Sequence, residues 1–233
     1  TDILIGGLGN EVKDDGDGPA MKAYLNDEKF VNGGLTNETP ILILKLTDSS
    51  GINTVGTGIG HNLTAVVDDN TRETFILNDF YEADQDSYQS GKVRFQLPKL
   101  EEGFHRISIK AWDVFNNSSE YLLECQVVKK EDLTIKHVLN YPNPFTTRTQ
   151  FWFEHNRPGE QLQVTVQVMT ITGKLVKTIA KTIKSDGNRS SEIEWDGRDD
   201  YGGKLGRGVY IYRLRVRGGD GKVQEKLEKL LIL

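Results

Sequence analysis

Apolar and polar residues alternate along most of this chain, and this alternation limits the possible folds more than any other feature. In residues 161–169 (QLQVTVQVM), Leu162, Val164, Val166 and Val168 are separated by glutamine or threonine. Successive strand side chains point to opposite faces of a sheet, so each such segment has one buried and one wetter face. Apolar residues at helical spacing are almost missing. The pattern therefore predicts an all-β protein of packed sheets.

The expected strands fall into two sets of seven. The first set lies at 21–25, 40–47, 62–69, 72–78, 92–97, 104–112 and 120–128, and the second at 135–141, 149–155, 161–169, 174–181, 191–195, 208–217 and 222–233. Seven short strands in about 100 residues are typical of an immunoglobulin-like sandwich. The charged stretch 127–134 (VVKKEDLT) separates the sets. We therefore expect an all-β fold of two tandem immunoglobulin-like β-sandwich domains.

The first 18 residues differ from the rest of the chain. Residues 1–7 (TDILIGG) read as a strand, and residues 8–18 as a polar, turn-rich tether. The strand either ends an upstream domain or adds to the edge of the first sandwich. Because residue 1 is threonine and no signal peptide follows, we expect a mature product or a fragment.

Composition excludes some classes of function. The 233 residues carry a formal net charge of −5, which argues against a sequence-independent nucleic-acid binder. No apolar run approaches the roughly 20 residues that a membrane-spanning helix needs. We therefore expect neither nucleic acid as a partner nor a membrane span.

No residue of the chain is assigned to catalysis. Cys125 is the single cysteine and lies in an alternating segment, which favours a small buried core residue over a nucleophile. The histidines (His61, His105, His137 and His155) are scattered and carry no protease-like signature. We expect that this chain is not an enzyme.

Two further motifs have structural as well as functional interpretations. The acidic clusters at 14–18, 68–70 and 82–86 are either solvated turns or, at one of them, a calcium site, although none has EF-hand spacing. The glycine-rich GTGIGH (56–61) precedes an alternating strand rather than a helix, which favours a loop over a nucleotide site. No metal ligand and no cofactor are assigned.

Residues 141–145 read YPNPF and follow the linker. The two prolines lack a backbone N–H and push the preceding residues toward extended geometry, so the segment suits an edge strand. Tyr141 and Phe145 are expected to anchor that strand by burying their rings. WDGRDDYGG (195–203) is expected to be a packed tryptophan followed by a turn-rich loop.

The chain ends in LEKLLIL (227–233), which has apolar residues on both strand faces. This segment is either the last strand of the sandwich or a recognition strand that docks on a partner by edge pairing. The residues expected to bind a partner are Lys226, Leu227, Lys229, Leu230, Leu231, Ile232 and Leu233.

The order of motifs in the last part of the chain resembles a known family. YPNPF, then TGK (172–174), GVYIYRL (208–214) and a lysine-bearing terminal strand are similar to the C-terminal sorting domain of the Bacteroidetes type IX secretion system, and residues 192–214 resemble the FlgD-like immunoglobulin domain. The resemblance assigns the sorting motif to Tyr141, Pro142, Asn143, Pro144, Phe145, Gly173, Gly208 and Tyr210.

Stretches of the first half, such as GINTVGTGIGH (51–61), together with YPNPFTTRTQFWFEHN (141–156), are similar to the region behind the peptidase domain of the PorU family of gingipain-like (C25) sortases. This resemblance implies domains at 1–18 (a strand or tether from an upstream domain), 19–130 (a spacer sandwich) and 131–233 (the sorting domain). The parent would be a surface cysteine peptidase and transpeptidase that removes cargo sorting domains. Its catalytic domain would lie upstream.

The implied partners are an outer-membrane barrel protein of the PorV type, other components of the attachment complex and the upstream peptidase domain. The implied location is the cell surface, in association with the outer membrane. The terminal domain is longer than the usual domain of secreted cargo and ends in LLIL instead of a basic tail, which favours a retained docking module. Two other hypotheses stay open: a cargo adhesin or carbohydrate-binding protein with a cleavable sorting domain, and a chain that hydrolyses a substrate itself.

Overall fold

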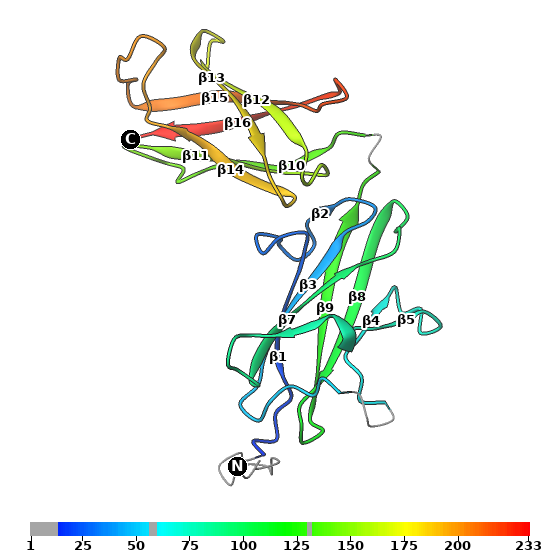
Figure 1. Ribbon diagram of the computed structural model, residues 1–233. Coiled ribbons are helices and arrows are strands. Elements are labelled where there is room, and N and C mark those ends of the chain that lie inside the picture. Colours follow the sequence, from blue (N-terminus) through cyan, green and yellow to red (C-terminus); the bar gives the residue numbers. More distant parts are fainter. Residues whose placement is uncertain (1–13, 56–59, 130–131) are drawn as a thin grey trace. The chain divides into compact units, whose positions relative to one another are not determined.

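The computed structural model describes residues 14–55, 60–129 and 132–233. Within these ranges the regular elements are sixteen strands and one short 3₁₀ helix, η1 (Asn78–Phe80), so the prediction of an all-β fold is confirmed (Figure 1). The expected strand at residues 1–7 and most of the GTGIGH motif lie outside the described residues. No helix in the described part of the chain is long and apolar enough to cross a membrane.

Strands β1 to β9 form two sheets that make the first sandwich. One sheet has the order β1 (Ala20–Leu25), β3 (Ile41–Thr47), β7 (Ser90–Gln96) and β6 (Tyr81–Ala83). The other has the order β2 (Leu35–Thr36), β9 (Ser118–Val127), β8 (Gly103–Trp112), β4 (Thr64–Val67) and β5 (Thr74–Ile76). All seven predicted segments contain a strand, whereas β2 and β6 were not predicted because two or three residues are too few to show alternation.

The second sandwich consists of a three-stranded and a four-stranded antiparallel sheet. The first has the order β10 (Ile135–Tyr141), β11 (Thr149–His155) and β14 (Arg189–Trp195). The second has the order β13 (Leu175–Lys184), β12 (Gln161–Thr170), β15 (Gly208–Arg217) and β16 (Val223–Ile232). Every strand predicted in this half is present, and two immunoglobulin-like sandwiches in tandem are confirmed.

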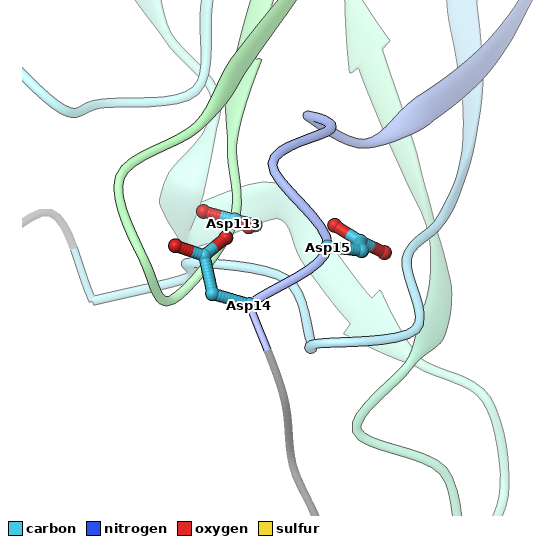
Figure 2. A group of neighbouring side chains, drawn as sticks. All are labelled: Asp14, Asp15 and Asp113. Atoms are coloured by element: carbon cyan, nitrogen blue, oxygen red, sulfur yellow. The ribbon is translucent and has the colours of Figure 1, made fainter.

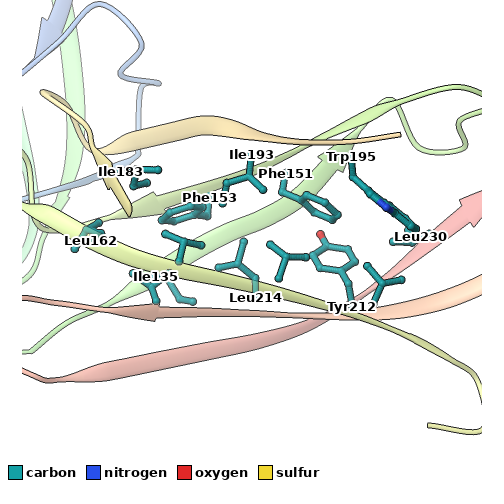
Figure 3. Packing of buried hydrophobic residues seen from close by; sticks show 14 of the residues in the cluster. Ile135, Phe151, Phe153, Leu162, Ile183, Ile193, Trp195, Tyr212, Leu214 and Leu230 are labelled. Carbon is teal, nitrogen blue, oxygen red and sulfur yellow. The ribbon is translucent and has the colours of Figure 1, made fainter. Parts of the chain in front are cut away.

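The core of the second sandwich lies between these two sheets (Figure 3). The predicted inward face of β12, from Leu162 to Val168, is buried, as are Leu214 and Tyr212 of β15. The ring of Tyr212 meets the ring of Phe151 edge-on, with centroids 4.8 Å apart. Aromatic pairs in this geometry stabilise a core beyond the area that they bury. The alternating pattern therefore identifies the core face of the strands directly.

The chain divides into two compact units. One contains the described residues up to Tyr24 together with Ile41–Leu97 and His105–Glu124, and the other contains Leu25–Pro40, Pro98–Phe104 and Cys125–Leu233. The domain boundaries expected near residues 18 and 130 stay a prediction.

Candidate functional site

The YPNPF segment connects β10 to β11 at one end of the second sandwich. The peptide bonds before Pro142 and Pro144 are both cis. The carbonyl oxygen of Pro142 accepts a hydrogen bond from the hydroxyl of Thr149 at 2.8 Å, and the Asn140 amide donates to the same hydroxyl oxygen at 3.0 Å. Asn140 and Thr149 are buried, and these bonds give partners to the Asn140 Nδ2 and the Thr149 hydroxyl, whereas Asn140 Oδ1 has no partner among the described residues. The two bonds fix the start of the segment.

The same segment is bound to the C-terminal strand by backbone hydrogen bonds. The N–H of Phe145 donates to the carbonyl of Leu231 at 3.1 Å, and the N–H of Leu233 donates to the carbonyl of Phe145 at 2.9 Å. These bonds form a parallel bridge between Phe145 and Ile232. The last residues of the chain therefore lie between β15 on one side and the YPNPF segment on the other.

The side chain of Asn143 extends this pairing. Its Nδ2 donates to the carbonyl of Lys229 at 3.1 Å, and its Oδ1 accepts from the N–H of Leu231 at 3.0 Å. An asparagine amide offers one donor and one acceptor group, as a peptide unit does. Asn143 thus takes the place of a strand residue where Pro142 and Pro144 cannot donate. We call these contacts of Asn143 and Phe145 with Lys229–Leu233 the terminal clasp.

Replacing Asn143 by alanine removes both of these hydrogen bonds. We expect the free energy of unfolding of the C-terminal sandwich to fall by about 1–2 kcal/mol, because each net hydrogen bond contributes about 1 kcal/mol. Aspartate at the same position keeps the acceptor for the Leu231 N–H but places a carboxylate oxygen against the carbonyl of Lys229, so it should cost at least as much as alanine. Chemical denaturation of the three proteins measures this order, and equal stability of all three would contradict the clasp.

Phe145 holds the clasp to the core. Its side chain is 3% exposed, and its ring meets Trp195 edge-on at 5.7 Å. Gly197 has φ +75°, and a Cβ added there would lie 3.3 Å from the Phe145 ring. Trp195 is the first residue of WDGRDDYGG, and its indole Nε1 donates to the carbonyl of Arg198 in the following loop at 2.9 Å. The expected packed tryptophan followed by a turn-rich loop is thereby confirmed.

The prediction that both aromatic rings of YPNPF are buried is half wrong. Phe145 is buried as predicted, but Tyr141 is 69% exposed. Tyr141 is the last residue of β10, and its neighbour Asn140 occupies the buried face, so alternation turns the tyrosine ring toward solvent. A packing role is therefore excluded for Tyr141, which leaves an exposed aromatic ring beside the clasp.

The remaining sorting-motif residues lie on the sheet that contains the terminal strand. Tyr210 is paired with Leu230 on one side and Thr170 on the other, and its hydroxyl donates to the carbonyl of Gly206 at 2.9 Å. Gly208 opens β15 opposite Ile232. Gly173 closes the β12–β13 hairpin at φ +86°, a left-handed conformation that favours glycine. These three residues have structural roles in the described geometry.

The terminal strand is the edge of its sheet and pairs with β15 along its whole length. Leu230 and Ile232 are buried in the core. Leu231 is half-buried, and Lys226, Leu227, Lys229 and Leu233 are exposed. Of the residues expected to bind a partner, only these last five are accessible in this conformation.

Packing accounts for Cys125, and hydrogen bonds account for the first acidic cluster. Cys125 is fully buried on β9, as predicted for a core residue.

Asp14 and Asp15 of the first acidic cluster lie close to Asp113, and the carboxylate oxygens of the three residues lie within 4.8 Å of one another (Figure 2). The amide of Asn117 donates to Asp14 at 2.8 Å and to Asp113 at 2.9 Å, and backbone N–H groups also bind Asp113. These hydrogen bonds show that the three carboxylates stabilise turns. The sequence analysis missed Asp113 because it lies about 100 residues further along the chain.

Fold and site together define a class of protein: two immunoglobulin-like sandwiches in tandem, the second with a proline motif clasped to its terminal strand. No family model and no curated protein matches the chain. Among solved structures, the chain is similar to dimeric latent PorU from Porphyromonas gingivalis, with 31% identity, a TM-score of 0.51, and coverage of 98% of this chain and 21% of that one. The resemblance to PorU that the motifs indicate is confirmed, and the chain spans about a fifth of that protein.

Two further solved structures are less similar to the chain than this one. The fibronectin(III)-like modules of Clostridium thermocellum CbhA are 9% identical, with a TM-score of 0.32 and coverage of 91% of this chain and 93% of theirs. The protein SGBP-B of Bacteroides ovatus, solved with a mixed-linkage heptasaccharide, is 13% identical, with a TM-score of 0.27 and coverage of 93% and 48%. Neither similarity is close enough to indicate a function for this chain.

Proposed function

We propose that this chain is the non-catalytic C-terminal part of a type IX secretion system sortase. The first sandwich serves as a spacer behind an upstream peptidase domain, and the second serves as the secretion signal and as a docking module for an outer-membrane barrel of the PorV type. The observation that carries this proposal is the terminal clasp, which joins the sorting motif and the terminal strand into one folded site. Similarity to PorU over 98% of the chain supports it.

The terminal clasp determines which side chains of the sorting motif and the terminal strand are accessible to a partner. Leu230 and Ile232 hold the strand in the core, so recognition uses side chains that the clasp leaves exposed. Tyr141 and Leu233 are 69% and 54% exposed and lie at the two ends of the clasped segments. Large apolar side chains held on a rigid scaffold are well suited to binding, because little conformational entropy is lost on association. Edge pairing by a partner strand is restricted to the part of β16 before Lys229, since Asn143 and Phe145 occupy the rest.

In this proposal, bond cleavage belongs to the upstream domain, and the protein acts at the cell surface in association with the outer membrane. The chain contributes binding alone. Retention of the sorting domain follows from its role as a docking module, because cleavage would release the enzyme from its partner.

The test uses the full-length protein in its own cell. Deleting residues 227–233 would remove core residues and confuse docking with folding, so we choose exposed positions. The double variant Tyr141→Asp, Leu233→Asp is expected to keep the wild-type melting temperature and to lose co-purification with the barrel partner. The matched control is Tyr201→Asp, Leu122→Asp, which alters side chains that are 97% and 48% exposed elsewhere. Normal co-purification of the first variant would contradict the proposed docking site.

A further inference from the structure

The outer face of the four-stranded sheet carries three arginines on one strand. Arg213, Arg215 and Arg217 alternate along β15 with side chains that point into the core, such as Leu214, so all three lie on the face away from it. Arg215 and Arg217 are exposed and Arg213 is half-buried. Across the described ranges, none of the three has a carboxylate within ion-pair distance. We call these residues the arginine ladder.

The register shows what lies beside the ladder. On β12, Gln167, Thr165 and Gln163 stand opposite Arg213, Arg215 and Arg217 in that order. On β16, the corresponding residues are Leu227, Glu225 and Val223. These rows contain amides, a hydroxyl, two apolar side chains and one carboxylate, but no aromatic ring. The ladder is therefore a basic strip of the sheet with hydrogen-bonding groups along one side.

The surrounding charge has the same sign. Residues 132–233 contain 17 Lys and Arg and 12 Asp and Glu, a net charge of +5. Residues 1–131 contain 12 and 22 of these residues, a net charge of −10. The acidic character of the whole chain thus comes from its first half, and the ladder lies in a basic part that attracts anionic partners.

We propose that the arginine ladder binds an extended acidic segment of a partner protein. Alternate residues of an antiparallel strand are about 6.8 Å apart, so the three arginine side chains leave β15 at that spacing. Carboxylates at alternate positions of an extended peptide have the same repeat, and each can form charge-assisted hydrogen bonds with one arginine. The lack of aromatic rings in the neighbouring rows disfavours single-stranded nucleic acid, whose bases stack on such rings.

The test measures binding of a fluorescent peptide of alternating glutamate and threonine to the intact chain at physiological salt. We expect Arg213→Gln, Arg215→Gln, Arg217→Gln to weaken binding about 10-fold, since each exposed ion pair contributes up to about 1 kcal/mol. Glu225→Gln removes the competing carboxylate opposite Arg215 and should tighten binding. The matched control, Lys136→Gln, Lys174→Gln, Lys204→Gln, removes the same charge from parts of the sandwich away from the ladder and should bind as the wild type does.

Three results would overturn the proposal. The first is equal affinity of the wild type and the ladder variant. The second is an equal loss in the ladder variant and the lysine control, which would indicate attraction to net charge alone. The third is tighter binding of heparin or poly(U) than of the peptide, with the same dependence on the three arginines, which would assign the ladder to another class of polyanion. If the triple variant does not fold, Arg215→Gln and Glu225→Gln still test it, with opposite expected shifts in affinity.

Discussion

Replacing Phe145 by alanine is expected to lower the free energy of unfolding of the C-terminal sandwich by about 3–5 kcal/mol, the usual cost of truncating a buried phenylalanine. The ring is 3% exposed and packs on Trp195, so its removal leaves a cavity beside the core. The same ring fixes the backbone that pairs with Leu231 and Leu233. Loss of the ring should therefore also loosen the terminal strand.

This loss is measured by denaturation followed through tryptophan fluorescence. A Trp112→Phe background removes the tryptophan of the first sandwich and leaves Trp152 and Trp195 as reporters of the second. Tyr141→Ala is the matched control, because it truncates the other aromatic ring of the same motif at an exposed position. It should change stability by less than about 0.5 kcal/mol, as is usual for surface substitutions. A similar cost for both substitutions would mean that Phe145 does not anchor the motif.

Acid is expected to destabilise the same sandwich through His155. This imidazole is fully buried, its Nδ1 accepts a hydrogen bond from the N–H of Arg157 at 3.2 Å, and burial lowers its pKa from 6.5 to about 4. In the unfolded chain the ring takes up a proton below pH 6.5, whereas the folded protein keeps it neutral. The stabilisation is therefore complete above that pH and is lost as the pH falls toward 4, by about 3 kcal/mol in total.

The free energy of unfolding at pH 7 and pH 4 checks this expectation. In His155→Phe, the difference in stability between the two pH values should shrink by that amount, because the phenyl ring does not titrate. His61→Gln is the control, since that histidine lies in the first sandwich. An unchanged pH dependence in His155→Phe would contradict a neutral buried imidazole.

The strands and their core faces could be predicted from the sequence because they depend on local alternation. QLQVTVQVM shows which side chains are buried without any knowledge of their neighbours, and the structure places them as predicted. The very short strands β2 and β6 were missed for the same reason, since alternation needs more residues to be visible.

The candidate site could be predicted only in its parts. The YPNPF motif and the terminal strand were both identified, but their contact joins residues more than 80 positions apart and depends on the closure of the sandwich. The exposure of Tyr141 was predicted wrongly, because a ring beside proline gives no local signal of the face that it occupies. Asp113 joined the acidic cluster for a comparable reason of long-range packing. Local sequence patterns therefore identified the strands and the YPNPF motif. The contacts that join them into the terminal clasp depend on tertiary packing, which those patterns do not show.

Amide hydrogen exchange at Phe145, Leu231 and Leu233 tests the terminal clasp most directly. The account predicts that these three amides exchange slowly in the intact chain and that Asn143→Ala accelerates exchange at Leu231, whose N–H loses its acceptor. Rapid exchange of all three in the wild type, at the rate of an open chain end, would show that the sorting motif and the terminal strand do not form one folded site.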